Sequence, residues 1–197
     1  EQSPSPAYVV HLGELRRNLE ILKNVGDASG ATILLALKGF AMIGVFPLLR
    51  NYLKGVCASG LHEARLGAES FKGIVHTFSP AFKESDLKEC IRYSDHIVFN
   101  SFNQWKRFRE TVQAAAKHIS VGLRVNPEVS TAAVPLYDPC SPGSRLGILR
   151  SEFDGESLEG IEGLHFHTLC EQNSDALEVT LEGFEDRFKE FLPSLKW

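Results

Sequence analysis

Lys38 is the residue of this chain whose type and position are best suited to covalent chemistry. It follows the seven uncharged residues ATILLAL, 31–37. Nearly continuous apolar runs of this length are typical of parallel strands that are covered on both faces. Residue 38 would then lie at the rim of an α/β fold, where ligand sites gather. Partial desolvation at a rim favours the neutral amine that Schiff-base chemistry needs, whereas a lysine that extends into water would have no chemical role.

Two histidines alternate in the segment GLHFHTLCE, 163–171, and would point to one face of a strand. With Cys170 or Glu171, His165 and His167 could bind zinc. No second cluster of ligands supports a metal, so we expect no metal site. An imidazole packed against a flat ring is the other use of such a histidine, and Cys170 alone would be a small buried apolar residue.

Three further charged residues are candidates for a site. Glu63 follows the expected strand 55–58, either as a carboxylate at a helix N-terminus or as a site residue. Arg124 lies inside an apolar strand, so it needs either a salt bridge to a neighbouring strand or an anionic ligand. Arg145 lies in a loop, 126–145, of a length that is often functional, and it could hold an anion or a partner subunit.

The elements that must position these residues alternate along the chain. We expect strands at 31–37, 55–58, 73–77, 96–99, 119–125 and 163–168, after a short extended segment at 8–10. We expect helices near 12–22, 41–52, 62–69, 82–92, 101–115 and 177–195. This order predicts a parallel α/β sheet, either doubly wound or part of a (β/α)₈ barrel. Nucleotide-binding glycine motifs are missing. Six strands cannot close a barrel of eight, so either the sheet is open or the chain is not the whole protein.

Composition narrows the class of protein. The 197 residues carry a formal net charge of −4, which disfavours nucleic acid as a partner. Four cysteines without a C-x-x-C pair favour reduced thiols and a cytoplasmic location. No apolar run is long enough to predict a membrane span, and residues 1–6 are expected to form an arm.

Seven short motifs, in order along the chain, resemble those of the fold-type III decarboxylases, which depend on pyridoxal 5'-phosphate (PLP). This family includes ornithine, arginine and diaminopimelate decarboxylases and is related in fold to alanine racemase. The motifs are ALKG (36–39), ASGLHE (58–63), HTFSP (76–80), IVFNS (97–101), LRVNP (123–127), SRLG (144–147) and GLHFH (163–167). The segment FHTLCE, 166–171, departs from the His-x-Gly-Ser pattern of ornithine and diaminopimelate decarboxylases. Together with LKGF (37–40) and the long loop, it is more similar to the carboxynorspermidine decarboxylase branch of the family.

The resemblance implies a fold and a cofactor site. It implies the PLP-binding (β/α)₈ barrel of alanine racemase type, with residues 1–197 as its N-terminal part of about six βα units and a C-terminal β-domain outside the chain. Lys38 would form the Schiff base with the cofactor, and His167 would stack on its ring. Glu63 would lie near the ring with Arg124 supporting that carboxylate. Cys170 would stand near the phosphate, where relatives have a serine.

The resemblance also implies an activity and partners. The activity would be the decarboxylation of carboxynorspermidine or carboxyspermidine to norspermidine or spermidine, with Arg145 at the substrate carboxylate or a dimer interface. Apart from the resemblance, we hypothesise that Glu171 is a further anion for the cationic substrate. The partners would be this carboxylated polyamine and either a second copy in a homodimer or a complementary C-terminal fragment. The alternatives are another decarboxylase of the family, a barrel aldolase that uses Lys38 directly on a carbonyl, and a homologue without turnover.

Overall fold

The computed structural model describes residues 4–197 and contains a six-stranded sheet in which all strand pairs are parallel. The strands are β1 (Leu34–Ala36), β2 (Gly55–Ala58), β3 (Ile74–Phe78), β4 (His96–Phe99), β5 (Ser120–Arg124) and β6 (Gly163–His165). Each strand pairs with the next along the chain, in the order β1-β2-β3-β4-β5-β6. This order is that of a barrel wall, because the strand order of a doubly wound sheet reverses partway. The expected parallel α/β fold with six strands is confirmed.

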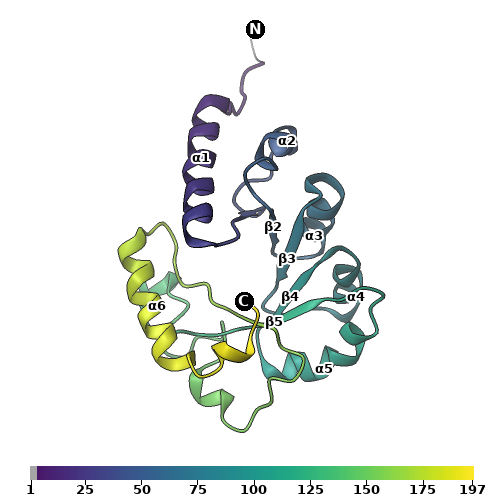
Figure 1. The fold of residues 1–197 in the computed structure, drawn as a ribbon, viewed down its shortest axis with the longest axis vertical. Helices are drawn as coiled ribbons and strands as arrows, with labels where there is room; N and C mark the ends of the chain where they lie inside the picture. Colours follow the sequence, from purple (N-terminus) through teal and green to yellow (C-terminus); the bar gives the residue numbers. More distant parts are fainter. Residues whose placement is uncertain (1–3) are drawn as a thin grey trace.

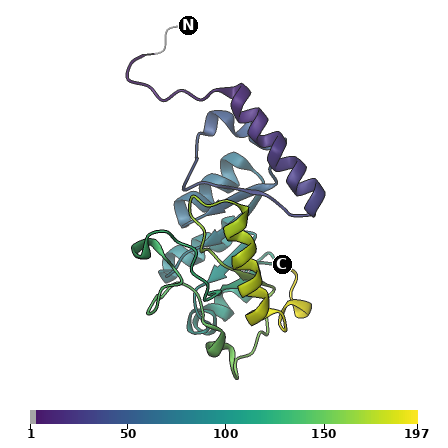
Figure 2. The ribbon, with the colours of Figure 1, turned by 90° about the vertical axis from the view of Figure 1, so that its left-hand side faces the viewer.

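Helices line the outer side of the curved sheet, and the chain ends at its inner side (Figure 1). The α-helices are α1 (Leu12–Ser29), α2 (Phe46–Leu49), α3 (Leu61–Leu66), α4 (Glu84–Tyr93), α5 (Phe102–Gln113) and α6 (Ser174–Phe188). The shorter turns are η1 (Ile43–Val45), η2 (Gly67–Phe71), η3 (Pro135–Tyr137), η4 (Arg150–Phe153) and η5 (Leu192–Ser194). Figure 2 looks at the open side of the arc, with α1 above and α6 below. No helix within residues 4–197 combines the length and the hydrophobicity of a membrane span.

Several expected elements differ from the structure at their ends. The strands at 55–58 and 96–99 have the expected bounds, whereas β1 and β6 keep only three residues each. The helix expected at 41–52 is replaced by η1 and the single turn α2, which has Pro47 in its first turn. The extended segment expected at 8–10 forms no strand, and the first three residues of the expected arm lie outside the described residues.

The outer core is built largely as the sequence indicates. Ser101 caps α5 by accepting a hydrogen bond from the Gln104 backbone amide at 3.2 Å. The helix then buries its aromatic stripe, which includes Trp105 and Phe108, in a cluster that covers β4 and β5. The buried apolar stripe expected on α6 is only partly correct. Phe184 and Phe188 are buried, whereas Leu181 and Leu177, one and two turns earlier, are exposed. Within residues 4–197, α6 covers the last strand of the arc, and its outer leucines remain exposed.

The inner side of the sheet holds an aromatic cluster around Trp197. The Trp197 Nε1 donates a hydrogen bond to Ser120 Oγ at 2.9 Å. A Cβ atom at Gly122 or Gly163 would overlap the indole, so these two glycines make room for it. His76 on β3 and His96 on β4 lie in edge contact with the ring, at centroid distances of 5.3 and 5.5 Å, and His165 on β6 stacks on His76.

The backbone of the last residues continues the sheet. The Trp197 amide donates to the Glu162 carbonyl at 3.3 Å, and the Leu164 amide donates to the Trp197 carbonyl at 3.1 Å. This alternation across Gly163 is the hydrogen-bond pattern of a parallel strand pair. The chain therefore starts a seventh parallel position beside β6.

We expect the histidine cluster to make the fold sensitive to acid. Burial lowers the pKa of His165 to about 3 and that of His76 to about 4, so both stay neutral in the folded chain. Unfolded histidines gain a proton near pH 6.5, so the stabilisation is present above that pH and is lost as the pH falls toward 4. The free energy of unfolding should therefore fall between pH 7 and pH 5, by on the order of 1–2 kcal/mol for each buried histidine.

Urea unfolding at the two pH values, followed by tryptophan fluorescence, measures this loss. His165→Gln should make the loss clearly smaller than in the wild type, while His62→Gln, at an exposed position on α3, should leave it unchanged. An equal loss of stability in His165→Gln and the wild type would contradict the assignment of the acid response to the cluster.

Candidate active site

Lys38 lies in a tight turn directly after β1, at the carboxyl end of the strand. The Leu37 amide still reaches the Cys57 carbonyl of β2 at 3.1 Å, and the Gly39 amide then turns back to the Ala36 carbonyl at 3.0 Å. Leu37 is buried in the core cluster, and Lys38 lies close enough to His167 for its positive charge to lower the pKa of that imidazole. The Lys38 side chain is exposed, which contradicts the expected partial desolvation. The reason is that β1 is the first strand of an open arc, with a neighbour on one side only.

Arg124 and His167 join Lys38 at the same rim. On β5 the flanking Leu123 and Val125 are fully buried in the outer core, so Arg124 points inward. After β6, Phe166 packs on the outer core and His167 follows on the inner side. The structure thus brings together three of the residues that the sequence singles out, each from the carboxyl end of a different strand.

Arg124 is a buried cation for which the structure supplies no anion. Its side chain has 5% exposure, and no ion pair within residues 4–197 includes it. The guanidinium donates to the His167 carbonyl at 3.0 Å and lies over the Phe78 ring at 4.9 Å, but its Nε has no partner. Burial lowers its pKa. Of the two roles expected for Arg124, the interstrand salt bridge is absent and the anionic ligand remains.

The imidazole of His167 lies within the electrostatic reach of both cations. Crowding of its ring lowers the pKa of His167, and the positive charges of Arg124 and Lys38 lower it further. The side chain is nevertheless open to solvent. A neutral, accessible imidazole between two cations can pack against a flat anionic ligand without adding a third positive charge.

Glu63 is fixed by its own loop and does not meet Arg124. Its carboxylate accepts hydrogen bonds from the Ser59 amide at 2.8 Å and from the Ser59 hydroxyl at 2.9 Å. The expected support of Glu63 by Arg124 is therefore wrong in this structure. Ser59 lies only four residues earlier, at the start of α3, and satisfies the carboxylate locally. Glu63 still lies after β2, at the carboxyl rim of the sheet.

The remaining candidates lie in the loops around the rim. Cys170 and Glu171 are exposed and line a cavity of about 320 Å³ between the long loop and the segment after β6. Arg145 is exposed and lines a separate cavity of about 500 Å³ within the long loop. Its backbone carbonyl accepts a hydrogen bond from Asn100 Nδ2 at 2.8 Å, which ties the loop to the end of β4. No contact in the structure joins Arg145 to Lys38.

The zinc alternative finds no support in the geometry. Across the part of the chain that the structure describes, no three His, Cys, Asp or Glu side chains gather as metal ligands. His165 instead stacks between the rings of His76 and Phe78, at centroid distances of 5.7 and 5.1 Å.

Two residues of the site were missed by sequence reasoning. The Phe78 ring contacts both the Arg124 guanidinium and the His165 imidazole, and its signal was the alternation with His76 on β3. Cys140 belongs to the long loop, yet its thiol lies near the Arg124 guanidinium, which partly opposes the rise that burial imposes on the pKa of that thiol. Nothing in the sequence around Cys140 indicates that the loop folds back onto β5.

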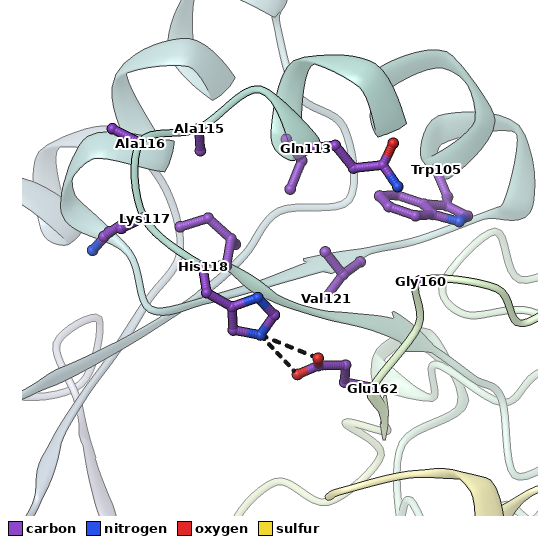
Figure 3. Close-up of a pocket in the computed structure, with 11 residues that line it drawn as sticks. Trp105, Gln113, Ala115, Ala116, Lys117, His118, Val121, Gly160 and Glu162 are labelled. Carbon is purple, nitrogen blue, oxygen red and sulfur yellow. Dashed lines mark hydrogen bonds and ion pairs between the residues drawn. The ribbon is translucent and has the colours of Figure 1, made fainter.

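A further cavity, of about 390 Å³, lies at the opposite end of β5 (Figure 3). In Figure 3, His118 faces Glu162 across its entrance, at 3.1 Å. Glu162 also accepts hydrogen bonds from Lys196 at 2.7 Å and from Ser120 at 2.6 Å. Burial raises the pKa of Glu162, but these two bonds and the contact with His118 outweigh it and lower the pKa to about 2. Because that carboxylate is already paired, this end of the sheet offers less for chemistry than the rim with Lys38.

The structure of residues 4–197 is a parallel half-barrel with a lysine after its first strand and an arginine without an ion pair inside the arc. A family model described as alanine racemase, N-terminal domain, matches residues 10–186. The chain belongs to this family.

Two curated relatives match almost all of the chain. A carboxynorspermidine/carboxyspermidine decarboxylase of Campylobacter jejuni is 46% identical over 197 residues, which are 100% of this chain and 50% of the relative. A carboxyaminopropylagmatine decarboxylase of Synechocystis is 43% identical over 194 residues, 98% of this chain and 50% of the relative. The chain thus spans about half the length of the curated relatives that it matches.

Solved structures agree on the fold. The crystal structure of carboxynorspermidine decarboxylase complexed with norspermidine from Campylobacter jejuni matches with a TM-score of 0.89 at 44% identity, over 98% of this chain and 49% of that one. Diaminopimelate decarboxylase from Helicobacter pylori matches with a TM-score of 0.74 at 13% identity, over 91% of this chain and 49% of that one, and supports the fold alone. The expected half-barrel of alanine racemase type is confirmed.

Replacement of the buried cation should separate a ligand-binding role of Arg124 from a structural one. In Arg124→Met the lost hydrogen bond and ring contact are offset by removal of a buried, unpaired charge. We expect the free energy of unfolding to change by less than about 1 kcal/mol in urea titrations. Leu123→Ala, on the same strand, is the matched control and should cost about 2–5 kcal/mol. A loss of more than about 3 kcal/mol in Arg124→Met would indicate that the guanidinium is there to stabilise the fold.

Proposed function

We propose that this chain is part of a PLP-dependent decarboxylase that acts on a carboxylated polyamine, carboxynorspermidine or carboxyspermidine. Identity of 46% over all 197 residues to a decarboxylase of that name supports the activity. The observation that carries the proposal is the buried Arg124, which has no anion of its own and lies beside His167 on a rim that also holds Lys38. At such a rim the Arg124 guanidinium can bind an anionic ligand and the Lys38 amine can react with it.

The side chains at the rim fit PLP, the cofactor that this decarboxylase family generally uses. When bound, PLP supplies an aldehyde for an amine and a conjugated ring that takes up the electron pair released with CO₂. Lys38 is the amine at the rim that would hold the aldehyde. The neutral His167 would lie against the ring, and the unpartnered Nε of Arg124 would face an anionic group.

The other site residues have supporting roles in this proposal. Ser59 holds the Glu63 carboxylate at the end of β2, where it can act on the charge of the ring. The Arg124 hydrogen bond fixes the backbone of His167 and so orients its imidazole. We place Cys170 near the phosphate and Arg145 near the substrate carboxylate or a dimer interface, in both cases by the family resemblance.

The identity of the polyamine has two candidates. The Campylobacter jejuni and Synechocystis relatives have similar identity to this chain, 46% and 43%, but their names differ in the cationic tail of the substrate. An agmatine-type tail ends in a guanidinium, whereas a norspermidine-type tail ends in an ammonium. We favour the ammonium substrate, because the solved structure that resembles this chain at a TM-score of 0.89 is of a carboxynorspermidine decarboxylase.

We also propose that residues 1–197 are the N-terminal part of a complete barrel, joined by further βα units from the same or another polypeptide. The backbone of Trp197 has already started a parallel position beside β6. Exposed apolar side chains also gather on the two end helices of the arc, where further units would cover them: Leu12, Ile21, Leu22 and Val25 on α1 and Leu177, Val179 and Leu181 on α6. A homodimer of completed barrels in the cytoplasm is the assembly that the resemblance implies, and all four cysteines are free in the structure.

Binding of PLP to the chain tests the cofactor directly. We expect the chain to take up added PLP and to develop visible absorption that borohydride removes, because Lys38 forms a reducible imine. Lys38→Ala should lose this absorption. Lys54→Ala should keep it, since Lys54 precedes β2 at the other end of the strands. The aldolase alternative instead predicts a colourless chain in which borohydride traps a carbonyl substrate without PLP.

Substrate choice can be measured once the barrel is completed. The chain should be assayed for CO₂ release alone and when mixed with the carboxyl-terminal half of the Campylobacter jejuni relative. We expect turnover of carboxynorspermidine or carboxyspermidine only in the mixture, and at least about 100-fold slower turnover of ornithine and diaminopimelate. Faster turnover of either amino acid would refute the polyamine assignment, and a homologue without turnover predicts no release from any substrate.

A further inference from the structure

We propose that Phe78 is a positioning residue, whose ring holds the Arg124 guanidinium against the backbone of His167. The part that this contact has in catalysis rests on the proposed function, because His167 is the side chain assigned there to the cofactor ring. Phe78 is the last residue of β3, Arg124 is the last residue of β5, and His167 follows β6. The three residues therefore form a chain of contacts along the rim, from the third strand to the sixth.

The contacts of the Phe78 ring reach two other strands. The Arg124 guanidinium lies over the ring, with its Cζ atom 4.9 Å from the ring centroid. The same guanidinium donates a hydrogen bond to the His167 carbonyl at 3.0 Å. The ring also stacks on the imidazole of His165, at a centroid distance of 5.1 Å and an interplanar angle of 23°. Phe78 thus contacts the last residue of β5 and the last residue of β6, the strands that bring Arg124 and His167 to the rim.

The register of the sheet explains why a large side chain is needed at residue 78. β4 separates β3 from β5, and neighbouring strands lie about 4.8 Å apart, so a contact between Phe78 and Arg124 spans about 10 Å. Val98 of β4 pairs with Phe78, and the same row continues through Gly122 and Gly163. Since valine is short and glycine has no side chain, this row leaves room for a ring that reaches across β4.

An aromatic ring stabilises a buried cation without neutralising its charge. A carboxylate at residue 78 could also hold the guanidinium, but it would form an ion pair and cancel the positive charge. With the ring, Arg124 keeps its charge close to His167. Crowding of the imidazole lowers the pKa of His167, and the charge of Arg124 lowers it further. Phe78 therefore allows one arginine both to hold the backbone of His167 and to keep its imidazole neutral.

An NMR titration of His167 in the chain tests this role without any cofactor, because the pKa of His167 reports where the Arg124 charge lies. In Phe78→Leu the guanidinium loses the ring and should move away, so we expect the pKa of His167 to rise. Phe78→Tyr keeps the ring face and should restore the wild-type pKa. In an Arg124→Met background, Phe78→Leu should add no further rise, because the residue that transmits the effect is already absent.

PLP uptake by the same variants measures the consequence for the site. We expect the half-saturating PLP concentration to rise about three- to tenfold in Phe78→Leu, as loss of a cation–ring contact does. Phe82→Leu is the matched control, because Phe82 makes its edge contact with Phe99 in the outer core, at 5.8 Å. It should change the PLP concentration by less than about twofold. Phe78 is half-buried, so Phe78→Leu should fold and have a urea midpoint close to that of Phe82→Leu.

The outcomes separate this inference from the proposed function. If Phe78→Leu leaves the pKa of His167 unchanged, or changes it no more than Phe82→Leu does, the positioning role is wrong. Failure of Phe78→Tyr to restore the wild-type pKa, or failure of Phe78→Leu to fold, would also overturn it, because residue 78 would then act through packing alone. If the wild type takes up no PLP while the pKa of His167 still depends on Phe78 through Arg124, the proposed cofactor fails and the positioning role stands.

Discussion

The burial of Arg124 is the constraint on which the rest of the site depends. Its guanidinium lies in a fully buried strand, away from water. It contacts a backbone carbonyl and an aromatic ring but no carboxylate, and its Nε has no hydrogen-bond partner. The hydrogen bond to the His167 carbonyl sets where the chain runs after β6. The positive charge also contributes to keeping His167 neutral. A buried cation without an anion is stable only if something else compensates it, so the rim is arranged for a ligand that the chain itself does not contain.

The parallel direction of the strands explains why the rim and the opposite end of the sheet differ. All six carboxyl ends emerge on one side, so Lys38 after β1, Arg124 at the end of β5 and His167 after β6 lie at the same rim although they are far apart in the sequence. Toward the opposite end the Trp197 indole packs against His76 and His96, and the Glu162 carboxylate is already paired. One end of the arc is thus packed and satisfied, while the other keeps unpaired charges.

Local patterns in the sequence predicted the centre of the sheet well and its edges poorly. The strands at 55–58 and 96–99 were correct because buried strands have neighbours on both sides that fix their ends. β1 is shorter than expected and Lys38 more exposed, since the first strand has one neighbour only. β6 is also shorter than expected. There the Arg124 side chain donates a hydrogen bond to the His167 carbonyl, so this carbonyl does not extend the pairing of β5 with β6. The alternation on β3 places Phe78 on the same face as His76, but the contact of Phe78 with Arg124 depends on how β3 and β5 align, which no local pattern shows.

The position of the cofactor bond tests the account most directly. The chain can be incubated with PLP, reduced with borohydride, digested and analysed by mass spectrometry to find the modified lysine. We predict that the adduct lies on the peptide that contains Lys38, and that Arg124→Met decreases the yield of this adduct at a fixed cofactor concentration. An adduct spread over exposed lysines, or concentrated on a lysine at the opposite end of the strands, would contradict the assignment of this rim as the active site.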